Sequence, residues 1–564
     1  MLSGLDDAAR SRPMSRSRST WQRPVDRWLF LLLLLASVVP FWTVAYVPTQ
    51  DGPSHLYNAV ALRQYVFNPD GIERLYYELN PSPSANWVSH IALALLTSAF
   101  SPRTAEKLLL SGYVIAFALS VRFALGNLGS SARGFAILAF PFIGGWALHM
   151  GFYNFSFGLA FYFVVLGCLV RTESSPPLRR AAILGGVATA LYLIHPLVFD
   201  LALLSTVVLV CFGAVLAWRK ERAGPGNFGM RNVLWSAFAA TIAFLPGVVL
   251  QLAWIQKRGV PAELVWLPTD TLWALLWQLA PVTVWEESEA AWATALLLLF
   301  VALLFSGLWL RRRDWTLRGS DGFLVLALVL IGFYFLAPHW AFRVGLLSFR
   351  LLYFPFFALL LWLGAQRWPP ALRLSAQIIA AVIASGFLFQ HAVVYKRFDP
   401  YLRDYTSLGK DVEGDSAILA LTTGGTLWEL EPERVTLRVE PFLHAAGYIA
   451  AERGLVYLNN YEAFIGTFPL RFRPGIDPAK HMGDPGQVPP DMDFLRYDER
   501  TPASVDYALV WEPGPWTPHR WLSAQDYRRI TDSWWPQLRE GFDRIGTSST
   551  GYGRLWRRKG RPER

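Results

Sequence analysis

The stretch VPTQDGPSHLYNAV, residues 47–60, places a carboxylate and an imidazole directly after an apolar run. Asp51 and His55 lie about one helical turn apart, and Gly52-Pro53 between them favours a turn or a helix start. A carboxylate in this position could take a proton from an acceptor hydroxyl. Together with the imidazole it could also bind a divalent cation such as Mg²⁺ or Mn²⁺. The structural alternative is that Asp51 caps the N-terminus of a helix.

Two further turns carry polar side chains in apolar, aromatic surroundings. The turn WALHMGFYNFSFG holds His149 and Asn154, and the turn LIHPLVFD holds His195. Polar side chains in such surroundings must find partners. One interpretation places all three in an outward-facing cavity with Asp51. The alternative is that they join or cap helix ends.

Two arginines lie close together in the stretch PHWAFRVGLLSFRLLYFP, at Arg343 and Arg350. An arginine near lipid costs free energy unless it meets an anion, and phosphate suits the guanidinium because it accepts paired hydrogen bonds. The two residues are therefore predicted to bind phosphate. The alternative is that they pair with acids of the preceding segment, namely Asp270, Glu286 or Glu287.

The composition shows where these residues must be held. Of 564 residues, 53% are hydrophobic and only 17% are charged, and the mean hydropathy is +0.29. The apolar residues form long runs such as 28–47 and 291–310. A helix needs about 20 such residues to cross a bilayer. The chain is predicted to be a polytopic α-helical membrane protein.

Basic residues give the predicted topology. The net charge of +10 comes from short arginine clusters between the apolar runs. This pattern is typical of the positive-inside rule and not of nucleic-acid binding. It predicts a cytoplasmic basic tail over 1–27, an outer C-terminus and eleven transmembrane helices. The predicted spans are 28–47, 106–125, 134–148, 151–170, 181–196, 200–218, 233–255, 291–310, 322–338, 351–365 and 374–394.

The outer segments are predicted to carry structure of their own. The first outer loop, 48–105, contains the apolar stretch 86–100, which is short for a span and is predicted to be an interfacial helix. The transmembrane domain is predicted to cover 28–395, and a linker over 396–409 leads to a small extracytoplasmic α/β domain over 410–564. Within this domain the patterns predict strands at 416–422 and 504–512, a helix at 441–454 and a hairpin at 542–558.

A carboxylate after the first span, in a long outer loop with an interfacial helix before the second span, resembles the GT-C superfamily of integral-membrane glycosyltransferases. QDGPSHLYNA looks like the first-loop acidic motif, with Asp51 at the place of the catalytic acid, and NWVSHIALALL matches the juxtamembrane helix. Oligosaccharyltransferases carry a second acidic motif in the turn that here holds His149 and Asn154. The resemblance is to an uncharacterised bacterial subfamily with GFxNFxxG and HP turns, located in the inner (plasma) membrane.

The resemblance implies transfer of a hexosyl or pentosyl group, with inversion, from a polyprenyl-phosphate donor in the cell envelope. The acceptor would be a glycan, lipid or protein on the periplasmic side. Asp51 would act as general base, and His55 would orient it or bind phosphate. Arg343 or Arg350, with Mg²⁺ or Mn²⁺, would stabilise the departing phosphate. Because such a donor is already activated, one carboxylate suffices.

Three other functions remain as alternatives. A polyprenol-linked glycan ligase or polymerase would depend more on arginine and histidine than on one aspartate. A transporter should show acids or broken helices at mid-bilayer depth. A non-catalytic membrane scaffold would require no site at all. The sequence contains no Walker loop or HExxH motif, which disfavours nucleotide-driven transport and zincin-type hydrolysis.

Overall fold

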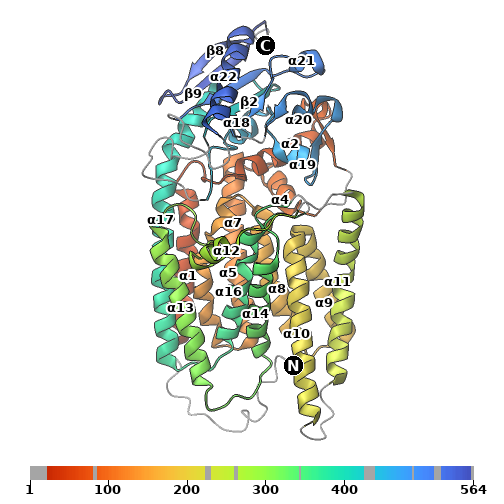
Figure 1. Cartoon of the computed structure of the whole chain (residues 1–564), viewed down its shortest axis with the longest axis vertical. Coiled ribbons are helices and arrows are strands. Elements are labelled where there is room, and N and C mark those ends of the chain that lie inside the picture. The colour runs from red at the N-terminus through yellow and green to blue at the C-terminus, as the bar shows by residue number, and fades with distance from the viewer. Residues whose placement is uncertain are drawn as a thin grey trace.

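The computed structural model describes residues 22–80, 85–222, 230–258, 264–341, 344–424, 438–485, 488–513 and 523–560. A bundle of long helices carries an α/β domain at one end (Figure 1). We call this end of the bundle the domain end, where Asp51 lies, and the opposite end the far end, where Leu128 and Leu310 lie.

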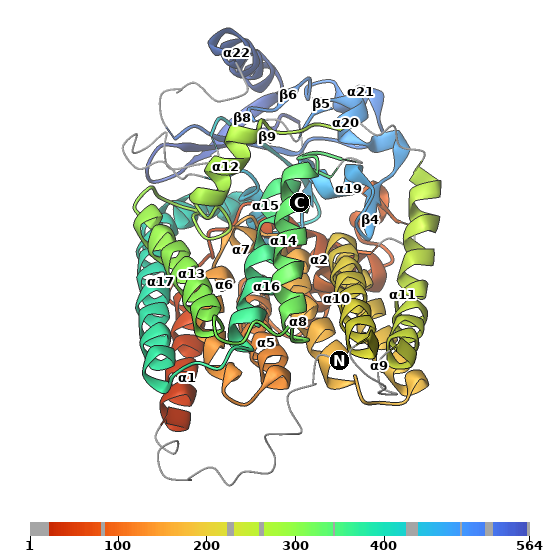
Figure 2. The ribbon, with the colours of Figure 1, turned by 60° about the horizontal axis from the view of Figure 1, so that its bottom comes forward.

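Nine helical segments in the described part of the chain are long and apolar enough to cross a membrane. They are α1 (Gln22–Trp42), α5 (Pro102–Leu128), α8 (Tyr153–Arg171), α9 (Pro177–Ile194), α10 (Pro196–Arg222), α11 (Met230–Arg258), α13 (Glu289–Leu310), the continuous pair α15 (Leu347–Leu351) and α16 (Tyr353–Gly364), and α17 (Pro370–Ser407). In Figures 1 and 2, α9, α10 and α11 gather on one side of the bundle, and α1, α13 and α17 on the other. The chain is a multi-pass α-helical membrane protein, as predicted.

The two remaining predicted spans take different forms. The span at 322–338 corresponds to α14 (Asp321–Leu336), an apolar helix of 16 residues. The span at 134–148 is a broken run of the 3₁₀ helix η2 (Ala132–Ala139), α6 (Phe140–Ile143) and α7 (Trp146–His149). Gly144 and Gly145 separate the last two pieces, and a side chain at Gly145 would lie 2.3 Å from the carbonyl oxygen of Pro281. Close backbone packing therefore interrupts this crossing.

The described part of the segment 48–105, which we call the first loop, contains four elements before α5: α2 (Gly52–Phe67), α3 (Glu73–Tyr76), β1 (Tyr77–Leu79) and α4 (Val88–Leu96). The predicted interfacial helix is α4, which has nine residues and is too short to cross a bilayer. It is amphipathic, because His90 and Leu93 are buried while Ile91 and Leu95 are exposed. The short helix α12 (Thr269–Trp277) lies between α11 and α13 in the chain.

The C-terminal domain is built on a five-stranded sheet in the order β3-β2-β7-β9-β8. Strands β2 (Ala417–Thr422), β3 (Val456–Tyr457) and β7 (Tyr507–Trp511) are parallel, and β8 (Phe542–Thr547) and β9 (Gly553–Arg558) form an antiparallel hairpin. Both predicted strands and the predicted hairpin are confirmed. The predicted helix is α18 (Ala446–Arg453), which ends at Gly454 with φ +67°. The smaller elements are η3 (Leu408–Asp411), α19 (Tyr461–Ile465), β4 (Leu470–Phe472), η4 (Pro474–Ile476), α20 (Pro478–His481), β5 (Gly483–Asp484), β6 (Asp491–Met492), α21 (Tyr497–Arg500) and α22 (Ala524–Gly541).

The two domains share structure. Strand β1 of the first loop pairs antiparallel with β4 of the C-terminal domain, with Tyr77 opposite Phe472. The segment 396–409 is a continuation of α17 through Ser407 rather than a loop. The loop 48–105 and the C-terminal domain therefore form one layer on the domain end of the bundle, and Asp51 lies within this layer.

Candidate functional site

Asp51 occupies the residue before α2 but does not cap that helix with its side chain. Its carboxylate oxygens instead accept hydrogen bonds from the Tyr461 hydroxyl at 3.0 Å and from the Gln50 amide at 3.2 Å. The His444 imidazole lies 3.8 Å from the carboxylate and stacks on the Tyr461 ring. The carboxylate is therefore directed toward the C-terminal domain.

Burial gives this carboxyl an unusual proton affinity. Asp51 is 7% exposed, and desolvation raises the pKa of its carboxyl to about 6. The positive charge on His55 and the hydrogen bond from Tyr461 lower the pKa only in part. An acid with such a pKa is ionised at neutral pH and still holds a proton more strongly than a solvent-exposed aspartate, which suits a general base.

Close backbone contacts hold Asp51 in place. The amide of Asp51 donates to the carbonyl of Met150 at 3.0 Å. Gly151 has φ +79°, and a side chain there would lie 2.3 Å from the amide nitrogen of Gly52. On the other side, a side chain at Gly447 would lie 2.5 Å from the carbonyl oxygen of Pro53. The Asp51 turn is thus clamped between the turn that precedes α8 and helix α18.

Arg350, on α15, lies near the same carboxylate. Its guanidinium is 4.4 Å from the centre of the Phe152 ring, and its charge interacts with Asp51. Its Nε is buried and has no hydrogen-bond partner among the described residues. Arg350 therefore lies beside the turn that contacts Asp51, and no ion pair joins the two side chains in the described part of the chain. Arg343 lies outside the described residues.

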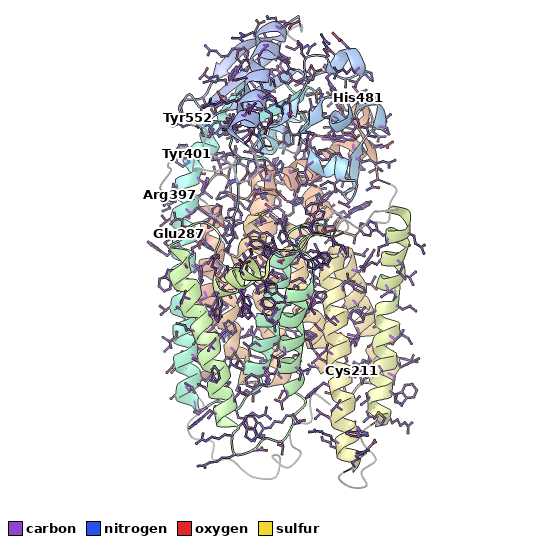
Figure 3. All side chains as sticks on the ribbon, viewed as in Figure 1. Cys211, Glu287, Arg397, Tyr401, His481 and Tyr552 are labelled. Atoms are coloured by element: carbon purple, nitrogen blue, oxygen red, sulfur yellow. The ribbon has the colours of Figure 1, made fainter. Side chains whose placement is uncertain are left out.

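The acids that were alternative partners for Arg350 make other contacts. Glu286 forms an ion pair with Arg397 of α17, and Asp270 accepts a hydrogen bond from its neighbour Thr271. Figure 3 shows Glu287 and Arg397 at the α17 edge of the bundle.

His55 contacts a different carboxylate from Asp51. Its Nδ1 lies 2.9 Å from Glu462 of α19 and 3.2 Å from Nε2 of His90 on α4. His90 Nε2 lies 2.7 Å from the other oxygen of Glu462. All three residues are buried, and their nearest nitrogen and oxygen atoms lie within 4.8 Å of one another. They form the only such group of three or more metal-ligating side chains in the described part of the chain, and Asp51 is not one of them.

The charges in this group depend on one another. Burial works against ionisation of His55, but the Glu462 carboxylate outweighs it and raises the pKa of His55. Burial likewise opposes ionisation of Glu462, yet His55 and His90 hold the pKa of that carboxyl well below its usual range. We call these three residues the His55–His90–Glu462 cluster.

The other predicted polar residues contact several different elements of the bundle. His149 directs Nε2 to the Tyr395 hydroxyl of α17 at 2.8 Å. Asn154 accepts from the amide of Ser89 and donates to the carbonyl of Asn86, so it joins α8 to the start of α4. His195 lies edge-on to Phe155, with ring centres 5.2 Å apart.

Several residues of the site were not singled out by the sequence. Glu106 of α5 is 1% exposed and accepts hydrogen bonds from Tyr153 at 2.6 Å and from Tyr448 at 3.1 Å. The sequence feature that could have drawn attention to Glu106 is an acid at the start of the apolar run 106–125. Glu462 and His444 gave no local signal, because nothing in their neighbourhood indicates contact with the first loop.

A second carboxyl lies beside Asp51. Burial raises the pKa of Glu440 to about 7, and the negative charge of Asp51 adds to the effect. The amide of Glu440 donates to the Gln50 side chain at 3.1 Å. Residues 438–444, which carry Glu440 and His444, therefore cover Asp51. Two surface cavities, of about 280 Å³ beside Arg103 and about 630 Å³ beside Trp309, do not include Asp51.

Comparison with known proteins gives solved structures only. No family model and no curated protein matches the chain. The archaeal oligosaccharyltransferase AglB from Archaeoglobus fulgidus, in complex with an inhibitory peptide and a dolichol-phosphate, is similar with a TM-score of 0.41 and 11% identity over 87% of this chain and 70% of that chain. The apo form of the Archaeoglobus fulgidus oligosaccharyltransferase gives a TM-score of 0.39, also with 11% identity and the same coverage.

Proposed function

We propose that this protein is an integral-membrane glycosyltransferase. It would transfer a hexosyl or pentosyl group from a polyprenyl-phosphate donor to a glycan, lipid or protein acceptor on the extracytoplasmic side of the membrane. The observation that carries the proposal is the buried Asp51 carboxylate at the domain end of the bundle, held between Tyr461 and the turn before α8, on whose Phe152 ring Arg350 packs. This end is where a membrane-embedded lipid would present its phosphate.

The proposed reaction is a single displacement at the anomeric carbon. Asp51 takes the proton of the acceptor hydroxyl as the new carbon–oxygen bond forms. The bond to the donor phosphate breaks, and the phosphate keeps the electron pair. Arg350 stabilises the negative charge that develops on that phosphate. Attack opposite the leaving group inverts the configuration of the sugar.

Substrate access requires movement. Asp51 is 7% exposed, and Glu440 and His444 lie over it. We propose that residues 438–444 move away from Gln50 when donor and acceptor bind, and that their return excludes water from the reaction. Exclusion of water would protect the activated sugar from hydrolysis.

The substitution Asp51→Asn tests the proposal. Transfer is measured in membranes with a polyprenyl-phosphate sugar donor identified from the glycan that is lost when the gene is deleted. We expect Asp51→Asn to lower transfer by at least about 100-fold, since general-base catalysis contributes this much. Asp200→Asn is the matched control, because Asp200 is an acid on α10 that is bonded to Gln251, outside the site. Full activity of a folded Asp51→Asn protein would contradict the proposal.

A glycan ligase or polymerase is the second candidate, because Arg350 and His444 both flank Asp51. In such an enzyme Arg350→Lys or His444→Gln would cost more activity than Asp51→Asn. A transporter has less support. The broken crossing at 132–149 is a feature that a transporter would also show, but it contains no acid, and Asp51, Glu440 and Glu462 lie at the domain end of the bundle.

A further inference from the structure

We infer that the His55–His90–Glu462 cluster is a binding site for a transition-metal dication of the Zn²⁺ type. The inference goes beyond the proposed function, whose steps involve Asp51 and Arg350 only. It also differs from the metal pair predicted from the sequence, because His55 is a ligand and Asp51 is not. The three ligands come from α2, α4 and α19, so the ion would join the first loop to the C-terminal domain.

The polar atoms of the three side chains lie close enough to share one ion. His90 Nε2 lies 2.7 Å from one oxygen of Glu462, His55 Nδ1 lies 2.9 Å from the other oxygen, and the two nitrogens are 3.2 Å apart. Nitrogen and oxygen ligands at about 2.0–2.1 Å from a tetrahedral zinc ion lie about 3.3 Å from one another. Small outward shifts of the side chains would therefore open the cluster to the size of a metal site.

The donor atoms of the three side chains also converge. His55 Nδ1 lies within hydrogen-bond distance of both Glu462 and His90 Nε2. A dication would bind the two nitrogen lone pairs and the carboxylate at one point.

The surroundings fix the ligands and limit the type of ion. The Phe468 ring packs against both imidazoles, at 5.8 Å from His55 and 5.1 Å from His90. Two imidazoles with one carboxylate suit zinc and its neighbours in the first transition row better than Mg²⁺. Three protein ligands leave one tetrahedral position for water or another ligand.

Direct metal binding tests the inference. The full-length protein is purified in detergent, treated with a chelator and titrated with Co²⁺, whose visible absorption reports tetrahedral coordination. Metal content after incubation with Zn²⁺ is measured by mass spectrometry. We expect one equivalent of either metal and a rise in the thermal unfolding midpoint. Wild-type protein that is folded but takes up no stoichiometric metal would overturn the inference.

Variants identify the ligands. We expect His90→Gln and Glu462→Gln to abolish the Co²⁺ absorption, whereas His481→Gln, at a histidine on α20 outside the cluster, keeps it. Asp51→Asn should also bind metal normally, which separates this inference from the proposed function. Unchanged Co²⁺ absorption in both ligand variants would overturn it. If these variants do not fold, X-ray absorption of the wild-type zinc complex decides, because a spectrum without imidazole scattering contradicts the inference.

Discussion

Asp51 combines two properties that oppose each other in a folded protein. Its carboxylate is useful as a base because it is buried, and the same burial makes its charged form costly. The sequence predicted the residue from its position after the first span. It could not predict the partners, because Tyr461 and His444 lie about 400 positions away and contact Asp51 only in the folded chain.

The pKa of Asp51 predicts the pH dependence of transfer. The base must be ionised, so we expect kcat/KM to rise with pH, to reach half its maximum near pH 6 and to level off above it. His444 does not contribute to this rise, because burial lowers the pKa of its imidazole to about 3. The check is a pH–rate profile between about pH 4.5 and 8. An increase that persists in the residual activity of Asp51→Asn would assign the titration to another group.

The same shift predicts that Asp51→Asn stabilises the fold. The pKa of Asp51 is 3.8 when unperturbed and about 6 in the folded protein. Stability from the protonated carboxyl is therefore present below pH 3.8 and lost as the pH rises through 6. Asparagine removes this loss, which is about 3 kcal/mol at most at pH 7. We expect the thermal midpoint of the variant to exceed that of wild type at pH 8 and to approach it at pH 5; a lower midpoint at pH 8 would contradict this.

At the scale of elements, the apolar runs were predictable and the breaks in them were not. A bilayer requires about 20 apolar residues in each helical crossing, so composition alone indicates where α1 or α13 lies. The crossing at 132–149 has the same composition, but the approach of Gly145 to the carbonyl of Pro281 interrupts it. This contact involves a segment more than 100 positions away in the chain. The spacing of apolar residues along the sequence therefore does not predict it.

The turn before α8 gives a prediction at this scale. We expect Gly151→Ala to displace Asp51 and to abolish transfer, because the new side chain would meet the backbone of Gly52. Gly466→Ala is the matched control: its φ of +72° is close to the +79° of Gly151, but the space around it is open. Gly466→Ala should therefore show only the strain of a positive φ, roughly 1–2 kcal/mol.

Thermal unfolding and transfer are measured on both glycine variants. Together they distinguish the cost of a positive φ from the steric clash of the new side chain with the backbone of Gly52. Equal loss of stability in the two variants, with transfer retained in Gly151→Ala, would mean that the turn relaxes without moving the carboxylate.

At the scale of the whole molecule, amino-acid composition shows where the chain changes from a membrane domain to a domain in water. It does not show which residues of the two parts contact each other. The predicted boundary near residue 410 follows this change. The structure joins the two sides through the β1–β4 pairing and through Asn58 and Asn460, whose side-chain amides donate to each other at 2.8 Å and 3.0 Å. These contacts are not recognisable in the sequence, because each partner alone is an ordinary polar or strand residue.

The proposed movement of residues 438–444 predicts that two cross-links between the first loop and the C-terminal domain have opposite effects on transfer. Glu78 of β1 lies directly opposite Arg471 of β4, so Glu78→Cys with Arg471→Cys should form a disulfide and keep transfer. Gln50→Cys with Glu440→Cys, joined by a short bismaleimide, should abolish transfer because it holds residues 438–444 over Asp51.

Both cross-linked pairs are made in a chain whose Cys168 and Cys211 are replaced by alanine, and cross-linking is measured from the loss of free thiols. The four single-cysteine variants are measured before and after the same treatment, so that the effect of the cross-link is separated from the loss of the Gln50 hydrogen bond to Asp51 and from addition of the reagent to one cysteine. The two pairs then distinguish a local opening from a separation of the whole domain. Loss of transfer in the disulfide-linked pair would mean that the entire C-terminal domain moves, whereas transfer in the cross-linked 50–440 pair would show that substrates reach Asp51 without displacing residues 438–444.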